Sequence, residues 1–287
     1  MKYGVFTVIL PELDLDETIA EVAAAGYGGI EWRCREIPAD KTDAPYSYWG
    51  NVKNDMSPVR VIRDGREIAG KCKAAGLQCF ALASYCNVLH EKDVREAAEA
   101  AAAIGARYFR VGPPHYGGDI NYNKLFTKAV KAYEKAVKTA QKCKVSVAIE
   151  THMGNITPSA GLVHRIVANF APREIGVIYD PGNMVTEGYE NYQMGLEQLG
   201  KYLRHVHVKN QMWRMVETLS DGTDRWAVEN SPLKKGCVDW RRVVRALRSV
   251  GFDGYLSIED FSNTPWKQKL NENIAYLKSV VAEVDGI

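Results

Sequence analysis

The chain has 287 residues, and its 37 Lys and Arg nearly balance its 35 Asp and Glu, for a formal net charge of +2. This balance argues against nucleic-acid or membrane-surface binding driven by bulk charge, and no apolar run approaches the roughly 20 residues of a membrane span. The six cysteines form neither a C-x-x-C pair nor a clustered framework, so we expect reduced thiols and a cytoplasmic location. Met1–Pro11 lacks a cleavage site and fits a first strand better than a signal peptide.

Strand and helix signals alternate along the whole chain. Strands are predicted near residues 3–8, 29–33, 77–84, 106–112, 145–150, 175–180, 203–209 and 255–260. Helices are predicted over about Asp16–Ala25, Pro58–Ala75, Lys92–Ile104, Tyr122–Cys143, Ser159–Asn169, Tyr192–Tyr202, Trp240–Val250 and Pro265–Val284. Eight such α/β units predict one domain, residues 1–287, with the closed (β/α)8 TIM-barrel fold. An open, doubly wound parallel sheet is the alternative.

A glycine separates an alanine-rich or apolar helix end from the following strand at four places. These glycines are Gly26, Gly76, Gly105 and Gly251. Glycine just past the last helical turn takes the left-handed conformation that ends a helix. Each phrase therefore predicts a helix stop followed by a strand start, which is the rhythm of repeated βα units.

Two predicted connections, Cys34–Ser57 and Asn210–Asp239, are longer than is usual between a strand and a helix. Both follow the carboxyl end of a strand, so both are expected to lie over the barrel mouth. Both also contain aromatic residues, of which Trp49 and Trp213 are examples. Their rings either stack on a substrate or pack on one another as small satellite cores.

Four of the predicted strands end in a side chain that can bind a metal ion. Side chains two residues apart in a strand share a face, which directs these groups toward the carboxyl end of the barrel, where barrel active sites lie. Charged groups there are costly unless paired or coordinated, so a shared ion is the economical interpretation, whereas a salt bridge would account for any one of them alone. The predicted ligands are Glu150, Asp180, His207 and Glu259. This set suits Mn²⁺ best, with Mg²⁺, Co²⁺ and Zn²⁺ as alternatives.

The choice of histidine follows from the strand pattern. His205 and His207 share a strand face, and His207 is nearer the carboxyl end. We therefore assign His207 as the ligand and His205 as its buried neighbour. Lys209 continues the same face and either binds a substrate oxygen or is a solvated rim lysine.

Further pocket candidates lie at other strand ends. His152 follows the fifth predicted strand and either acts as an acid toward a leaving group or bonds to the backbone. Arg110 lies at the end of the fourth strand, and Glu31 and Arg33 lie at the end of the second. A salt bridge between the second and fourth strands would account for the last three without any substrate.

Together, these segments resemble the xylose isomerase-like TIM-barrel superfamily, in its sugar isomerase and epimerase branch, over essentially the whole chain. The branch includes ketose 3-epimerases, hydroxypyruvate isomerases and inosose dehydratases, and endonuclease IV-type DNA-repair enzymes are distant members. The segments that carry the resemblance are Glu150, Asp180-Pro181-Gly182-Asn183, His205-Val206-His207-Val208-Lys209, Gly236-Cys237-Val238-Asp239-Trp240 and Gly254-Tyr255-Leu256-Ser257-Ile258-Glu259.

The resemblance implies an enzyme that binds a divalent metal ion and a small sugar and assembles as a homo-oligomer. In the epimerase relatives, the glutamates matching Glu150 and Glu259 are the acid and base as well as ligands. Asn183 stands where those epimerases have a histidine, and Arg214 approximately matches their substrate-binding arginine. The implied reaction is isomerisation or epimerisation through an enediolate, and elimination by a lyase or dehydratase on an oxo-sugar, 3-oxo-glycoside or inosose is the alternative.

Other functional classes fit the residues less well. A DNA-repair phosphodiesterase of the superfamily needs more histidines than the six present and a basic groove. A sugar-binding protein without activity does not need two metal-bound carboxylates. The string Gly26-Tyr27-Gly28-Gly29 precedes a strand, whereas a dinucleotide fingerprint follows one, so no nicotinamide cofactor is expected.

Overall fold

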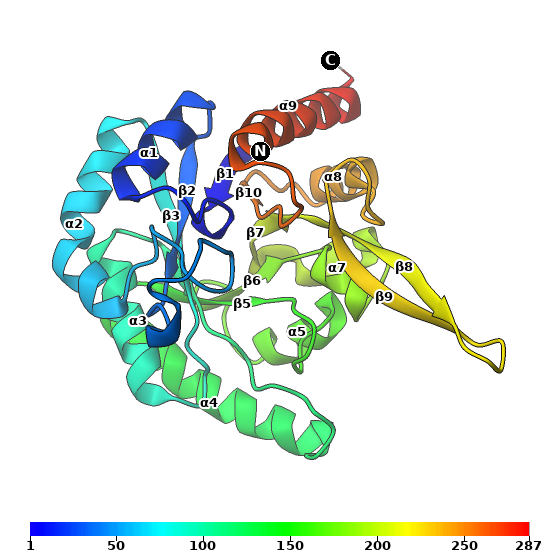
Figure 1. Cartoon of the computed structure of the whole chain (residues 1–287). Helices are drawn as coiled ribbons and strands as arrows, with labels where there is room; N and C mark the ends of the chain where they lie inside the picture. The colour runs from blue at the N-terminus through cyan, green and yellow to red at the C-terminus, as the bar shows by residue number, and fades with distance from the viewer. Residues whose placement is uncertain (287) are drawn as a thin grey trace.

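The computed structural model describes residues 1–286 and consists of a closed parallel barrel surrounded by helices (Figure 1). The barrel strands are β1 (Lys2–Phe6), β2 (Gly29–Cys34), β3 (Gln78–Ser84), β4 (Tyr108–Arg110), β5 (Ser146–Glu150), β6 (Ile175–Tyr179), β7 (Leu203–Val208) and β10 (Tyr255–Ile258). Pairing of β1 with β10 closes the ring, with Lys2 opposite Tyr255 and Val5 opposite Ile258. The predicted (β/α)8 fold is confirmed.

The helices cover the outside of the barrel. They are α1 (Leu15–Ala24), α2 (Pro58–Ala74), α3 (Glu91–Ala103), α4 (Tyr122–Lys142), α5 (Ala160–Val167), α6 (Asn183–Thr186), α7 (Tyr192–Leu199), α8 (Trp240–Ser249) and α9 (Trp266–Asp285). None of the described helices has the length and apolar character of a membrane span. The short helix α6, directly after β6, was not among the predicted helices.

Local signals in the sequence set several helix boundaries. The Asp14 side chain accepts from the backbone of Glu17 while the Glu17 side chain accepts from the backbone of Asp14, a capping box at the start of α1. At the other helix ends, the predicted glycine stops are confirmed, because Gly26, Gly76 and Gly105 have φ angles of 83°, 77° and 74°. Gly251 has a φ angle of 70°. An L side chain at these positions would be strained.

Two predicted strands differ most from the observed ones. The first ends at Phe6 and continues as a 3-10 turn, Thr7–Ile9, and the fourth is only Tyr108–Arg110. The fourth strand cannot be extended far, because Gly112-Pro113-Pro114 follows and proline has no N–H to donate to a ladder.

The barrel interior is layered from an apolar floor to a polar mouth. Phe80 and Tyr255 stack with their ring centroids 4.1 Å apart in the floor, beside Ala81, Tyr108, Ala148 and Ile178. Glycine at positions 4 and 29 leaves room for these rings, since a Cβ on Gly29 would lie 2.6 Å from the Tyr255 ring. A larger core fills the space between the strands and the outer helices.

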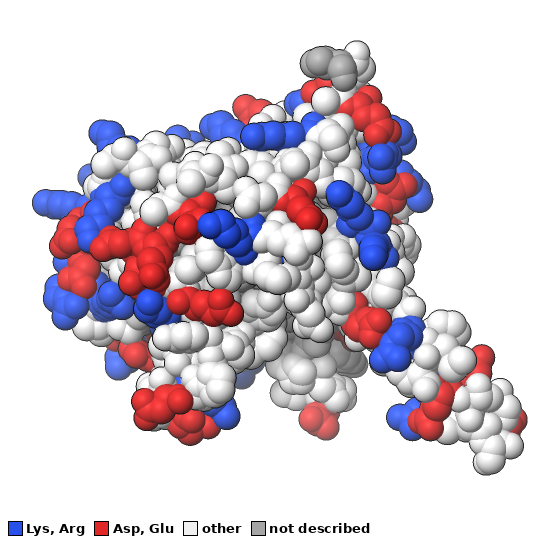
Figure 2. Space-filling view, turned by 45° about the horizontal axis from the view of Figure 1, so that its top comes forward, with Lys and Arg blue, Asp and Glu red and all other residues white. Residues whose placement is uncertain are grey.

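The expected loop at Asn210–Asp239 is largely a β-hairpin, which corrects the sequence prediction. Strands β8 (Asn210–Thr218) and β9 (Asp224–Ser231) pair antiparallel and project from the barrel (Figure 1). Leu219–Gly222 forms the turn, which the Gly222 N–H closes by donating to the Leu219 oxygen at 2.9 Å, with Gly222 at a φ angle of 86°. The Asp221-Gly222 dipeptide between strand-forming residues is a hairpin signal. On the face shown in Figure 2, acidic and basic side chains are interspersed over the barrel and the hairpin.

Candidate metal centre and substrate pocket

The carboxyl ends of four barrel strands bring together four side chains that can hold a metal ion. Glu150 ends β5, Asp180 follows β6, His207 lies in β7 and Glu259 follows β10. All four are buried, and each offers one ligand atom within 4.8 Å of the others. The structure thus gathers the four residues that the sequence singled out.

The separations between these atoms fit a common coordination sphere. His207 Nδ1 lies 3.1 Å from Glu150 Oε1, 3.4 Å from Glu259 Oε2 and 3.7 Å from Asp180 Oδ2. Ligands about 2.1 Å from an octahedral ion are about 3.0 Å apart when adjacent and about 4.2 Å apart when opposite. The observed distances fall within this range, so the donor set fits one divalent ion with little rearrangement.

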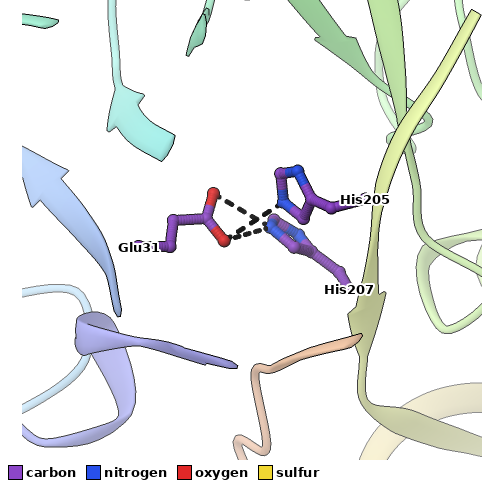
Figure 3. Close-up of side chains that lie close together, drawn as sticks. All are labelled: Glu31, His205 and His207. Atoms are coloured by element: carbon purple, nitrogen blue, oxygen red, sulfur yellow. Dashed lines mark hydrogen bonds and ion pairs between the residues drawn. The ribbon is translucent and has the colours of Figure 1, made fainter. Parts of the chain in front are cut away.

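Glu31 determines which nitrogen of His207 faces these carboxylates. The Glu31 side chain points across the barrel toward both imidazoles of β7 (Figure 3), and its oxygens lie 3.1 and 3.2 Å from His207 Nε2. Because an ionised carboxylate only accepts, Nε2 carries the proton that His207 donates. The Nδ1 atom of His207 is therefore the one available to a cation.

The rest of the Glu31 cluster is also connected by hydrogen bonds. His205 Nε2 lies 3.2 Å from Glu31 Oε2, which cannot donate, so we assign the proton of His205 to Nε2. Nδ1 then accepts from the Tyr108 hydroxyl, 3.0 Å away. Ser257 Oγ donates to Glu31 Oε2 at 2.7 Å. Neither histidine then directs a lone pair toward Glu31, so this group is better described as a support for His207 than as a second metal site.

The buried charges favour a divalent cation. Two cations, Arg110 and Lys209, face four carboxylates, those of Glu31, Glu150, Asp180 and Glu259. Two negative charges therefore remain when the histidines are neutral. Burial disfavours a charged imidazole, yet facing Glu31, Glu259 and Glu150 raise the pKa of His207 well above its ordinary value. The surroundings of His207 Nδ1 therefore stabilise positive charge, and one divalent ion would balance the cluster.

Two cations hold the candidate catalytic carboxylates. Arg110 Nη1 donates to Glu150 Oε2 at 2.6 Å, and Lys209 Nζ lies 2.7 Å from both Glu259 Oε2 and Asp180 Oδ2. Burial alone would raise the pKa of Glu150, but Arg110 and His207 hold it well below its usual range. Burial likewise opposes ionisation of Glu259. The charges of Lys209 and His207 outweigh this effect and lower the pKa of Glu259. Both glutamates are therefore ionised at neutral pH.

A cavity of about 570 Å³ opens above the carboxylates. Glu150, Glu259 and the predicted binding residues Arg110, His152, Asn183 and Lys209 line it. His152 Nδ1 also donates to the backbone oxygen of Met153 at 2.7 Å, so His152 meets both expectations, a place in the pocket and a bond to backbone.

Asn183 lines this cavity and has one buried acceptor atom without a partner among the described residues. Its Nδ2 lies 2.8 Å from Asp180 Oδ2, 3.0 Å from Glu150 Oε1 and 3.1 Å from the backbone oxygen of Thr151. These three acceptors fix the orientation of the amide. Asn183 Oδ1 is left buried without a protein donor, which is the arrangement expected of an atom that accepts from a ligand hydroxyl.

Other predicted positions lie away from the cavity. Arg214 pairs with Glu229 on the hairpin at 2.8 Å, and Trp213 Nε1 donates to the backbone oxygen of Val185. Neither residue lines the cavity. The salt bridge between β2 and β4 proposed as an alternative is wrong, because Arg110 pairs with Glu150 and Glu31 faces the two histidines of β7. Arg33 pairs with Asp55 instead, in the connection that folds back after β2.

Comparisons with known proteins agree with this architecture. A family model described as "Xylose isomerase-like TIM barrel" matches residues 19–280. An inosose dehydratase from Bacillus licheniformis is 24% identical over 209 residues, covering 69% of this chain, and the match spans only 64% of that relative's length. The E. coli 3-keto-D-glucoside 4-epimerase has a TM-score of 0.71 and 13% identity, with 97% of this chain and 99% of that chain covered. A structure of the IOLI protein with a zinc atom has a TM-score of 0.70 and 17% identity, with 99% and 98% covered.

Proposed function

The chain belongs to the xylose isomerase-like TIM-barrel family, and from that premise we propose that it is a divalent-metal-dependent sugar isomerase or epimerase. The observation that carries the proposal is the pair of buried glutamates, Glu150 and Glu259, at the floor of one cavity. They come from β5 and β10, which β6 and β7 separate in the barrel. Two ionised carboxylates approaching a substrate from different strands suit removal of a proton and its return at another position.

The chain's own residues have separate roles in this proposal. A divalent ion bound by Glu150, Asp180, His207 and Glu259 would polarise a carbonyl and its neighbouring hydroxyl. One glutamate takes the proton from the carbon next to the carbonyl. The other, ionised in the free protein, returns a proton to the resulting enediolate after it has itself taken one up from solvent. Asn183 Oδ1 accepts from a substrate hydroxyl. We propose Mn²⁺ as the ion, because carboxylates dominate the donor set, with Mg²⁺, Co²⁺ and Zn²⁺ as alternatives.

A lyase or dehydratase is the second candidate. Two observations favour it: the similarity to an inosose dehydratase and the presence of His152 in the cavity lining. An imidazole there would protonate a departing oxygen after the same first step, removal of a proton beside the carbonyl.

The proposal is tested by incubating the metal-loaded protein in D₂O with ketoses, 3-oxo-glycosides and inososes. We expect deuterium at one carbon next to the carbonyl, and a new epimer, isomer or unsaturated product identifies the reaction. Glu259→Gln should slow the exchange by at least about 10²-fold, whereas Glu229→Gln, on the exposed hairpin, should not. Exchange that is equally fast in Glu259→Gln, or no exchange with any of these classes, would refute the proposal.

We also propose that the protein is a homo-oligomer. Trp213, Met215, Trp226 and Val228 share one face of the hairpin by their pairing register, and the first three are substantially exposed. Two ion pairs stay within the hairpin, Arg225 with Glu217 and Arg214 with Glu229. The apolar face is therefore available to a second copy. Light scattering should give a mass above 32.0 kDa, and a monomer at micromolar concentration would contradict the proposal.

A further inference from the structure

The cavity above the carboxylates has two chemically different ends. Its inner end carries Glu150 and Glu259, whereas the exposed rings of Trp49 and Tyr85 line its outer part. The buried ring of Phe261 lies between Trp49 and Lys209. At about 570 Å³, the cavity lies within the range of pockets that hold drug-sized ligands, which are larger than one sugar ring. A free monosaccharide held at the inner end would leave the aromatic end unfilled.

Trp49 is unusual because it is both exposed and held in place. Its side chain keeps 59% of its surface accessible, while its ring contacts Phe261 with centroids 4.9 Å apart. Phe261 is supported from another direction by Tyr48, at 5.3 Å, and lies 5.4 Å from Lys209 Nζ at the inner end. Trp49 is therefore only one aromatic ring removed from the residues that hold Glu259.

A buried ion-pair network fixes the backbone on both sides of Trp49. Arg33 and Arg35 both bind Asp55, with N–O distances of 2.6 and 2.7 Å. Arg33 also donates to the backbone oxygen of Tyr48 at 2.6 Å, and Arg35 donates to that of Gly50 at 2.7 Å. The loop thus presents a preorganised indole at the cavity rim, which lowers the entropic cost of binding a flat ligand.

Tyr85 adds a second aromatic surface on the same side of the cavity. Its ring lies 5.8 Å from the guanidinium of Arg35, which also contacts the backbone of Trp49, and 4.5 Å from that of Arg110. Tyr85 keeps 44% of its surface exposed. Two accessible rings at one end of a cavity suit the apolar face of a further ring.

The charges argue against a phosphate at this end. Among the residues that line the cavity, the Lys and Arg side chains are Lys209 and Arg110, and each is already paired with buried carboxylates. A phosphate would need an uncommitted cation or a group of free backbone N–H donors. This end of the cavity therefore lacks the groups that would bind an anion.

We infer that the aromatic end is a subsite for a second, uncharged ring, so that the substrate is a glycoside, not a free or phosphorylated monosaccharide. This inference rests on the proposed function for the sugar held at the inner end. The second ring is a sugar or an aryl group, because both present a flat apolar face to Trp49.

The test is a binding measurement that does not depend on turnover. Mn²⁺-loaded protein is titrated calorimetrically with glucose, glucose 6-phosphate, methyl β-glucoside, phenyl β-glucoside and cellobiose, and with the corresponding galacto series. We expect phenyl glycoside, disaccharide or both to bind at least about tenfold more tightly than methyl glycoside, which is about 1.4 kcal/mol. The phosphate should bring no gain. Which of the two ligands gains identifies the second ring.

Variants locate the effect. Trp49→Ala should abolish the tenfold preference, and Trp49→Phe should retain most of it. Tyr189 lies on another loop and is equally exposed, at 58%, so Tyr189→Ala is the control and should leave the preference unchanged. Equal affinity for methyl and ring-bearing glycosides in the unmodified protein, or a preference that persists in Trp49→Ala, would overturn the inference. If the protein shows the binding preference but catalyses no deuterium exchange, only the proposed function is contradicted. If it exchanges free monosaccharides as efficiently as glycosides, only the subsite is contradicted.

Discussion

Glu31 is the residue on which the presentation of His207 depends most directly. It receives hydrogen bonds from His207 and Ser257, and His205 Nε2 lies 3.2 Å from it. Burial alone would raise the pKa of Glu31, but the two facing histidines hold that pKa well below its usual range. A carboxylate behind a ligating imidazole fixes its tautomer and ring orientation. Its role is therefore one of positioning.

Replacing Glu31 with Gln should weaken Mn²⁺ binding about 10- to 100-fold, because the amide no longer favours a proton on His207 Nε2. The dissociation constant is measured by calorimetry, alongside the absorption spectrum of the Co²⁺-loaded protein, which reports ligand geometry. Tyr108→Phe is the matched control, since it removes only the donor to His205 and should change the constant little. Unchanged affinity and spectrum in Glu31→Gln would show that the positioning role is wrong.

Lys269 provides a pH-dependent contribution to stability. Burial lowers its pKa to about 8, and its Nζ donates to the backbone oxygen of Asp260 at 2.9 Å. In an unfolded chain a lysine titrates near 10.4. Between these values the unfolded state binds more protons, so this group makes the folded state more stable as the pH rises through the window.

Lys269→Met removes this titration. Relative to the unmodified protein, the variant should therefore become less stable on going from pH 7 to pH 10, as measured by urea unfolding at both values. The lost hydrogen bonds shift both measurements alike, so only the change in the difference matters. A difference that stays constant, or moves in the variant's favour, would exclude a lowered pKa for Lys269.

At the residue scale, the sequence was most informative where a strand ended in a charged group. Glu150, Asp180 and Glu259 could be found because an ionised side chain directly after a β-branched run is costly to bury without a cation beside it. Glu31 could be recognised as inward-facing, but its partner could not, because His207 lies 176 positions away and only the barrel register determines that they meet. Arg33 was misassigned because its partner, Asp55, lies in the loop after β2, and the course of that loop could not be predicted from the sequence.

The ion pairs of Arg33 and Arg35 with Asp55 hold the connection between β2 and α2 in place. Asp55→Asn removes the charge from a site where two buried guanidinium groups converge. The expected loss is about 3–5 kcal/mol of unfolding free energy, because one partner of a buried ion pair is left uncompensated. Urea unfolding measures this loss, and hydrogen exchange at residues 47–52 should accelerate with it.

Asp64→Asn is a suitable comparison, because Asp64 pairs with Arg63 on the exposed surface of α2. Surface pairs contribute little to stability, so this variant should unfold almost as the unmodified protein does. Equal effects of the two substitutions would mean that the network does not hold the loop.

Sequence reasoning predicted the helices and strands of the barrel better than the additions to it. The repeated helix, glycine and strand phrases were reliable because the left-handed conformation at a helix end strongly favours a residue without a Cβ. The hairpin β8–β9 was missed although Asp221-Gly222 was visible, because its strands expose apolar and charged residues alike and lack the clean alternation of a half-buried strand. Helix α6, with four residues, is too short to give a periodic signal.

For the whole molecule, closure of the barrel is what turns distant strand ends into one site. Eight βα units were readable from the chain, and closure places the ends of β5, β6, β7 and β10 side by side in the order β10-β7-β6-β5. The floor of stacked aromatic rings supports the polar layer above it. The substrate end was less predictable, because the position of Trp49 depends on a loop whose course is set by the ion pairs of Arg33 and Arg35 with Asp55.

The central claim is that Glu150, Asp180, His207 and Glu259 bind one divalent ion, and anomalous diffraction from crystals soaked in Mn²⁺ tests it most directly. We expect a single strong anomalous peak about 2.0–2.3 Å from a carboxylate oxygen of each acidic residue and from His207 Nδ1. A strongest peak elsewhere, or one that His207 approaches through Nε2 beside Glu31, would contradict the claim.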